Sequence, residues 1–206
     1  MNVIVACEKS EAVTQALRAK GVEAWSCDLL PSEIPDYPYH IQNDIRNVID
    51  FGWDMMIAHP DCTYLASSGL HWNKRRPERQ METQKALDFV RWLFAQWLIP
   101  QICVENPIGC IPTQIDFKAF GFQKQVIQPY QFGEDASKAT VLFLKGLPKL
   151  IPTKYIEPRI VNGKKRWGNQ TDSGQNKLAP SDHRKADRAR TYQGIANAMA
   201  DQWIIK

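Results

Sequence analysis

The chain has 206 residues, of which 44% are hydrophobic, and its formal net charge is +4. This is enough sequence for one domain with a core of its own. No run reaches the roughly 18 consecutive apolar residues of a membrane span, and the first residues do not follow a secretory signal pattern. We therefore expect a soluble, cytoplasmic protein without a membrane partner.

The five cysteines are an odd set without a C-x-x-C pair, and no His/Cys cluster has the spacing of zinc ligands. These features argue against both a disulfide framework and a metal site. A reducing compartment fits this cysteine usage.

Positive charge is concentrated in the carboxy-terminal third of the chain. Residues 145–190 hold twelve Lys/Arg and four Asp/Glu, a net charge of +8, so the remaining residues carry −4. Phosphate contacts supply most non-specific affinity for nucleic acid, so this segment suits a polyanionic partner. A solvated basic surface explains the composition equally well.

The first part of the chain alternates predicted strands with predicted helices. Apolar runs predict strands at 3–6 and 54–58, and the second run is typical of a strand buried on both faces. The elements predicted between them are a helix around 12–17, a strand at 22–28, a short strand at 39–44 and a helical turn at 45–50.

The alternation continues with a long predicted helix over 78–98, which Pro100 closes. Strands are predicted at 102–104, 125–128 and 140–144, with candidate short strands at 155–156 and 159–161, and a helix or helix pair at 186–204. Between 146 and 181 the periodicity fades, and Pro and Gly punctuate a basic loop region.

This pattern predicts a Rossmann-like α/β fold, in which helices flank a mostly parallel sheet and a small basic loop and β segment lies near the carboxyl terminus. We divide the chain into a Rossmann-like core (1–145), a short basic segment (146–180) and a helical part that completes the core (181–206). Ligands of such sheets bind at the carboxyl ends of the strands. The residues expected on that rim are Cys7, Asp28, Asp44, Cys62 and Glu105.

Cys62 is a candidate nucleophile because it follows a buried strand directly, within His59-Pro-Asp-Cys-Thr-Tyr-Leu-Ala-Ser-Ser-Gly69. A thiolate is a far better nucleophile than a thiol, and a loop at the end of a strand can hold groups that assist its deprotonation. Most cysteines are structural, and we interpret the other four in that way. His59 could steer the loop or shuttle a proton, but we interpret it as a hydrogen-bonded structural histidine.

Glu105 is a candidate proton donor at the end of the next predicted strand, where Asn106-Pro107 stops the sheet. Partial desolvation there would raise the pKa of its carboxyl group, which suits a group that donates a proton near neutral pH. An ordinary carboxylate that caps a loop amide is the alternative for Glu105 alone.

Taken together, these motifs resemble those of the cytosine 5-methyltransferase family of DNA-modifying enzymes, in a compact form of phage or bacterial type. That family has a Pro-Cys-Gln-x-Phe-Ser-x-x-Gly-like motif and a Glu-Asn-Val motif. Here Asp61 separates Pro60 from Cys62, and Pro107 replaces the valine. Further segments resemble family motifs in the same order: Asp28, Asn43-Asp44-Ile45, Lys138-Ala-Thr140 and Ile195-Ala-Asn197-Ala198.

The resemblance implies methyl transfer from S-adenosylmethionine to carbon 5 of cytosine in DNA. Cys62 would add covalently to carbon 6, and Glu105 would protonate or hydrogen-bond ring nitrogen 3. Carbon 6 is unreachable in a stacked duplex, so the target base must be flipped out or unpaired.

The site residues that the resemblance implies fall into three groups. The catalytic residues are Cys62, Glu105 and Lys138. The cofactor-binding residues are Cys7, Glu8, Asp28, Asp44, Ile45, Pro60 and Asn197. The substrate-binding residues are Ser67, Ser68, Asn106, Thr140, Lys164, Lys165, Arg166 and Trp167. Trp167 stands among cations and could stack on an unpaired base.

Two alternatives remain open. The same chemistry could act on a free cytosine nucleotide or single-stranded nucleic acid, which the short segment at 146–180 would explain. The chain could also be a non-catalytic nucleic-acid-binding or inhibitory relative that has lost cofactor binding, since the first turn, Cys7-Glu-Lys-Ser-Glu-Ala12, has no glycine.

Overall fold

A seven-stranded sheet forms the centre of the structure, a computed structural model that describes residues 1–178 and 190–204. Its order is β3-β2-β1-β4-β5-β7-β6, with β1 to β5 parallel and β7 antiparallel to both of its neighbours. The strands are β1 (Asn2–Ala6), β2 (Glu23–Asp28), β3 (His40–Gln42), β4 (Met55–Ala58), β5 (Gln101–Pro107), β6 (Gln123–Ile127) and β7 (Thr140–Lys145). A separate hairpin pairs β8 (Arg159–Val161) with β9 (Lys164–Arg166). The predicted mostly parallel α/β sheet is confirmed.

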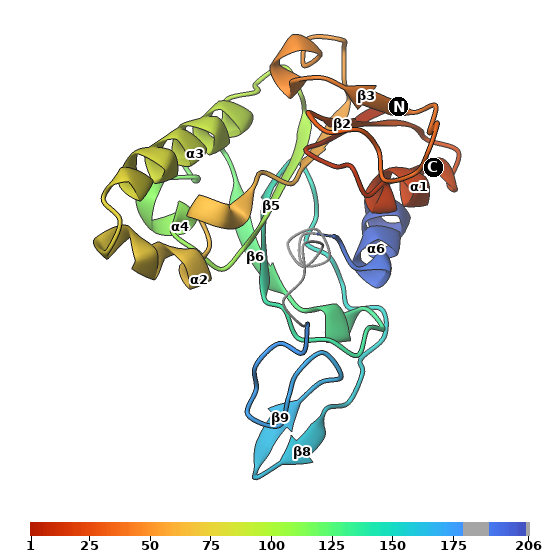
Figure 1. Cartoon of the computed structure of the whole chain (residues 1–206). Coiled ribbons are helices and arrows are strands. Elements are labelled where there is room, and N and C mark those ends of the chain that lie inside the picture. The colour runs from red at the N-terminus through yellow and green to blue at the C-terminus, as the bar shows by residue number, and fades with distance from the viewer. Residues whose placement is uncertain (179–189, 205–206) are drawn as a thin grey trace.

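Helices lie on both sides of the sheet, with α2, α3 and α4 on one side and α1 and α6 on the other (Figure 1). The helices are α1 (Ala12–Arg18), α2 (Ser67–Leu70), α3 (Glu78–Phe94), α4 (Ile111–Gln114) and α6 (Gln193–Trp203). The short 3₁₀ turns are η1 (Ile45–Asn47), η2 (Cys62–Tyr64), η3 (His71–Lys74) and η4 (Pro129–Gln131). Among the described residues, no helix has the length and apolar character needed to cross a membrane.

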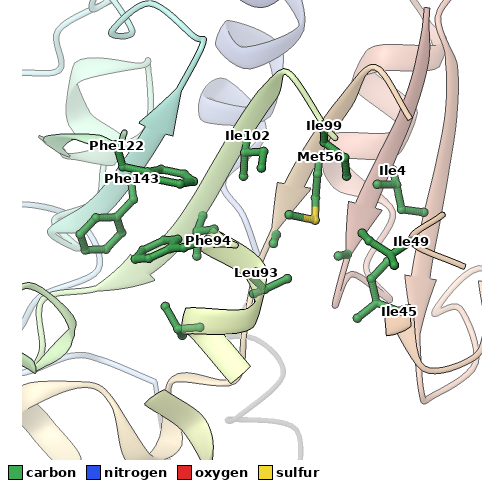
Figure 2. Close-up of a cluster of buried hydrophobic side chains, with 14 of the residues drawn as sticks. Ile4, Ile45, Ile49, Met56, Leu93, Phe94, Ile99, Ile102, Phe122 and Phe143 are labelled. Atoms are coloured by element: carbon green, nitrogen blue, oxygen red, sulfur yellow. The ribbon is translucent and has the colours of Figure 1, made fainter. Parts of the chain in front are cut away.

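Successive side chains of the central strands point alternately into two separate hydrophobic layers, because neighbouring residues of a strand face opposite sides of the sheet. Ile4 and Met56 face the layer that contains Leu93 and Phe94 of α3 (Figure 2). Their neighbours along the strands, such as Val3, Val5, Met55 and Ile57, face the layer formed by α1 and α6. Because both faces are covered, the central strands are apolar at every position, as β4 illustrates.

The carboxy-terminal helix completes the second layer by packing against α1. Trp203, 1% exposed, anchors its end and donates a hydrogen bond from Nε1 to the carbonyl of Pro148 at 3.0 Å. Of the helix or helix pair predicted over 186–204, the structure shows α6 from Gln193 to Trp203, whereas 190–192 are not helical and 186–189 lie outside the described residues.

Two predicted elements differ from the structure. The long helix α3 ends at Phe94 instead of residue 98, because Trp97 and Leu98 are 79% and 66% exposed and have no core to face. Residues 155–156 form no strand, whereas 159–161 does. The extended chain there follows the loop after β6, since the Ile156 amide bonds to the carbonyl of Tyr130.

Candidate active site

The carboxyl ends of the five parallel strands lie at one edge of the sheet, as predicted. Strand β1 leads to Cys7, β2 ends at Asp28, β4 leads to His59 and Cys62, and β5 carries Glu105 near its end. The register pairs Ala58 of β4 with Val104 of β5, so the next residues, His59 and Glu105, are adjacent. The topology therefore gathers candidate residues that are far apart in the sequence.

The loops after β4 and β5 are tied to each other. The side-chain amide of Asn106 donates a hydrogen bond from Nδ2 to the Pro60 carbonyl at 3.0 Å, and both residues are buried. The Ser67 amide donates to the Ile108 carbonyl at 2.9 Å. These contacts fix the positions of the two loops that carry Cys62 and Glu105. Asn106, predicted to bind substrate, therefore supports the loop, although its buried Oδ1 has no partner among the described residues.

Cys62 begins the short 3₁₀ turn η2 and is partly buried. Asp61 caps this turn by accepting hydrogen bonds from the amide and the hydroxyl of Thr63 at 2.8 and 2.5 Å. Burial raises the pKa of the Cys62 thiol, and the charges of Asp61 and Glu105 raise it further, while Lys138 opposes them. These effects indicate that Cys62, Glu105 and Lys138 belong to one electrostatic cluster.

Glu105 forms a buried pair with His59, whose Nδ1 lies 2.9 Å from Oε2 of the carboxylate. Burial alone would raise the pKa of Glu105, but the hydrogen bond and charge of His59, aided by Lys138, lower it. Burial alone would lower the pKa of His59, but the hydrogen bond and charge of Glu105 raise it. The predicted rise in the pKa of Glu105 is therefore wrong, because the sequence did not reveal the pairing with His59.

A small pocket beside Glu105 is also lined by the loop before β7 and by the start of α6. Its lining residues are Glu105, Lys138, Thr140, Thr191, Tyr192 and Ile195. The Thr140 hydroxyl donates to the Lys138 carbonyl at 3.2 Å, and the Lys138 ammonium lies 5.9 Å from the centre of the Tyr192 ring. Both members of the predicted Lys138/Thr140 pair thus lie beside Glu105. A larger concavity, lined by residues between 112 and 124, contains none of the predicted site residues.

The rim at β1 and β2 is acidic. Burial raises the pKa of Cys7 to about 12, and the charges of Asp28, Asp44 and Asp61 add to this effect. Such surroundings favour a cationic ligand, and a carboxylate after the second strand is the group that binds ribose hydroxyls in Rossmann-like folds. The residues present therefore fit a nucleoside that carries positive charge. Cys7 contributes a partly buried thiol.

Glu8, predicted to bind the cofactor, is 4% exposed, and its carboxylate caps helix α1. It accepts hydrogen bonds from the amides of Val13 and Thr14, at 2.8 and 3.1 Å, and from the Thr14 hydroxyl at 2.6 Å. The backbone of Cys7 and Glu11 is left-handed, with φ of 59° and 63°. Residues with side chains rarely adopt this conformation, so the glycine-free first turn is strained.

Two other predicted cofactor residues lie differently from what the sequence indicated. Ile45 is 4% exposed and packs in the hydrophobic layer with α3, so it supports the rim from beneath. Asn197 lies on the exposed side of α6, where its Oδ1 accepts a hydrogen bond from Gln193. Ile195, two residues earlier, is the part of that segment that reaches the pocket. Asp44 lies on the rim as predicted, and its side chain caps η1 by accepting a hydrogen bond from the Arg46 amide.

The segment from 146 to 178 is anchored to the loop before β7, next to Lys138. Asn169 exchanges two hydrogen bonds with Ser137 at 3.0 Å, directly before Lys138. Trp167 is 7% exposed and stacks on Tyr130 at 4.1 Å, so it is not the free stacking platform that was predicted. The hairpin of β8 and β9 projects beyond this anchor (Figure 1).

The predicted basic residues of this hairpin divide into two kinds. Lys164 and Lys165 are exposed, while Arg166 donates a hydrogen bond from Nε to the Asp172 carbonyl at 3.0 Å and holds the following loop. Ser67 and Ser68 are exposed at the start of α2. These two serines remain available for a ligand at the rim.

His59 was interpreted from the sequence as a structural histidine, and its pairing with Glu105 was not foreseen. Its signal was its position, since it directly follows β4 as Glu105 follows the apolar part of β5. Neighbouring parallel strands place such residues side by side.

The chain is similar to known proteins in its fold, but it matches no sequence family. No family model matches the chain, and no curated protein matches it. Among solved structures, it is similar to an E. coli protein assigned as a DNA modification methyltransferase encoded within a prophage, with a TM-score of 0.51 and 16% identity over 76% of this chain and 52% of that one. The chain shares the fold of this methyltransferase.

Two further solved structures are similar to the chain. The Entamoeba histolytica methyltransferase EhMeth has a TM-score of 0.49 and 14% identity, over 76% of this chain and 58% of that one. The S. pombe Dnmt2 methyltransferase has a TM-score of 0.47 and 15% identity, over 72% of this chain and 50% of that one. The chain thus spans about half the length of the structures it resembles.

Proposed function

We propose that the protein transfers a methyl group from S-adenosylmethionine to carbon 5 of cytosine in DNA. The observation that carries this proposal is the convergence of Cys62, Glu105 and Lys138 at the rim of a methyltransferase-like sheet. A thiol and a carboxylate are the two groups that cytosine requires, because its carbon 5 is too weak a nucleophile to accept a methyl group unaided. The ordered resemblance of the sequence motifs adds support.

In this mechanism Cys62 forms a bond from sulfur to carbon 6 of the ring. The displaced electron pair moves toward nitrogen 3, where Glu105 supplies a proton or hydrogen bond, and carbon 5 becomes enamine-like. The cofactor supplies an electrophilic methyl group on a sulfonium. A base, such as a water molecule, then removes the proton at carbon 5, Cys62 leaves carbon 6 as a thiolate, and nitrogen 3 returns its proton, which restores the ring. Lys138 provides positive charge beside Glu105.

The cofactor would lie at the acidic rim around Cys7. Asp28 would bind its ribose hydroxyls, as the residue after the second strand does in related folds. The combined negative charge of Asp28, Asp44 and Asp61 suits its cationic sulfonium and ammonium groups. Pro60 and the backbone after Cys7 would border it, and Glu8 would shape this turn by capping α1.

DNA would approach from the side on which the β8–β9 hairpin projects. We propose residues 146–180 as a short recognition segment, with exposed Lys164 and Lys165 as phosphate contacts. Ser67 and Ser68 lie at the rim and would contact the substrate near Cys62. The target base would have to leave the helical stack to reach Cys62.

The first test replaces Cys62 with serine. We expect C62S to lose methyl transfer by roughly 10³-fold or more, as removal of a catalytic nucleophile does, with the fold and DNA affinity nearly unchanged. The measurement is 5-methylcytosine formed in DNA, by mass spectrometry. C110S is the matched control, because Cys110 is another partly buried thiol on the neighbouring loop. Retained turnover in C62S would refute the covalent mechanism.

The second test concerns the hairpin. Replacing Lys164 and Lys165 with glutamine should reduce the slope of log affinity against log salt by about one for each lost phosphate contact. The measurement is a DNA titration over a salt series. W167F is the control, because Trp167 packs on Tyr130 and should leave the slope unchanged. An unaltered slope in the double variant would make this hairpin a solvated surface.

A free cytosine nucleotide or single-stranded nucleic acid is the second candidate substrate. It is favoured by the shortness of the segment at 146–180, which offers few residues for reading duplex DNA. Mass spectrometry of host DNA and of the nucleotide pool after expression separates the candidates. Calorimetry with S-adenosylmethionine tests the non-catalytic alternative, which the capped, glycine-free first turn favours, and heat of binding would exclude it.

A further inference from the structure

His59 and Glu105 are built as a unit next to Cys62. Their side chains are 10% and 11% exposed, and Nδ1 of the imidazole lies 2.9 Å from Oε2 of the carboxylate. The two residues occupy equivalent positions after neighbouring parallel strands, which fixes their separation through the sheet itself. An arrangement of this kind holds the histidine ring in one orientation.

The other ring nitrogen of His59 is buried and has no hydrogen-bond partner among the described residues. A buried polar atom left without a partner is unfavourable, because it has lost its hydrogen bonds to water. Nε2 is therefore placed to meet a polar atom of a bound ligand or an ordered water. This second feature distinguishes His59 from a structural histidine whose two ring nitrogens are both hydrogen-bonded within the protein.

The charges that face His59 come from three elements. Glu105 belongs to β5, Glu8 to the loop after β1, and Lys138 to the loop before β7. The partly buried thiol of Cys62 lies three residues further along the same loop. Two carboxylates against one ammonium favour a proton on the imidazole, and the pKa of His59 is accordingly raised despite the opposing effect of burial.

We propose that His59 is a positioning residue that stores the proton which Glu105 delivers to the substrate ring. This inference rests on the proposed function. When the sulfur of Cys62 bonds to carbon 6, an electron pair moves to nitrogen 3. The Nδ1 proton of His59 moves to the Glu105 carboxylate, and Glu105 passes a proton on to that nitrogen, so His59 becomes neutral and Glu105 ends the transfer ionised. When the bond to Cys62 breaks, the proton returns by the same route, so the pair ends as it began.

This role predicts a particular pH profile. Below the raised pKa of Cys62, the fraction of Cys62 present as thiolate grows tenfold per pH unit. Above the pKa of His59, the fraction of His59 that is protonated falls tenfold per pH unit. Log kcat/KM should therefore rise with pH and level off once pH passes the pKa of His59. A purely structural histidine would leave the rise uninterrupted at that point.

The experiment compares the wild type with H59N, which keeps an N–H near the position of Nδ1 but holds no exchangeable store of protons. We expect kcat to fall by roughly 10²-fold with KM nearly unchanged. The break in the pH profile should move to lower pH, since the Glu105 carboxyl must then hold the proton alone. The control is H71N, a histidine of η3 that makes a ring contact with Trp72. An unmoved break in H59N would overturn the inference.

A second readout requires no turnover. Imidazole ¹⁵N shifts of the ligand-free protein should give His59 a pKa above its ordinary 6.5, and E105Q should lower it. A His59 pKa below 6.5 in the wild type would overturn the inference alone, whatever the activity. A high His59 pKa in a protein without methyl transfer would overturn the proposed function and the proton delivery with it.

Discussion

At the scale of single residues, the first turn is organised by Glu8. Its carboxylate satisfies the amides of Val13 and Thr14, which are otherwise free at the start of α1. A carboxylate also interacts favourably with the positive end of a helix. A buried acid thus organises this glycine-free turn, in which the backbone of Cys7 and Glu11 is left-handed.

Replacing Glu8 with alanine should destabilise the protein by about 1–2 kcal/mol, because it removes a helix cap and leaves buried donors unpaired. Urea unfolding measures the change. E23A is the control, since Glu23 is exposed and forms only a surface ion pair with Arg18, and it should change stability by less than about 0.5 kcal/mol. Equal effects of E8A and E23A would contradict the capping role.

At the scale of elements, the site depends on the contact between the loops after β4 and β5. Gly109 is the tightest point, where an added Cβ would lie 2.0 Å from the Leu65 carbonyl oxygen. The Cys110 amide donates to that same oxygen at 2.9 Å. The loop backbones therefore touch, and only glycine permits this approach.

G109A should separate these loops, reduce stability by roughly 2 kcal/mol or more and lower methyl transfer together with it. Thermal unfolding and product formation measure the two effects. S68A is the stability control, because Ser68 is exposed on the same loop and its replacement should change stability by less than about 0.5 kcal/mol. A stable and active G109A would show that the loops tolerate separation.

At the scale of the whole molecule, the buried pair links stability to pH. The pKa of Glu105 is lowered below its ordinary 4.5, so its contribution is present above that value and is lost as pH falls through the folded pKa. The pKa of His59 is raised above 6.5, so its contribution is complete below 6.5 and is lost as pH rises through the folded pKa.

The pair should therefore stabilise the fold most between about pH 4.5 and 6.5. The free energy of unfolding, measured in urea from pH 4 to 9, should fall above this window more in the wild type than in H59N. H71N should follow the wild-type profile. Identical profiles for the wild type and H59N would mean that the pair does not make the stability of the fold depend on pH.

The sequence by itself determined the class of fold and the edge of the sheet at which the candidate residues gather. Apolar runs at β1 and β4, separated by an amphipathic helix, specify buried parallel strands, and parallel strands end at one edge. Cys62 and Glu105 became candidate site residues because each stands at the end of such a run. These are local patterns, which the spacing of residues encodes directly.

Only the tertiary structure decided the states and partners of these residues. It pairs Glu105 with His59, turns Glu8 into a helix cap and stacks Trp167 on Tyr130. Each of these contacts joins side chains whose meeting depends on strand register, loop path or backbone conformation. A pKa depends on what a group touches after folding, and periodicity in a sequence carries no information about that.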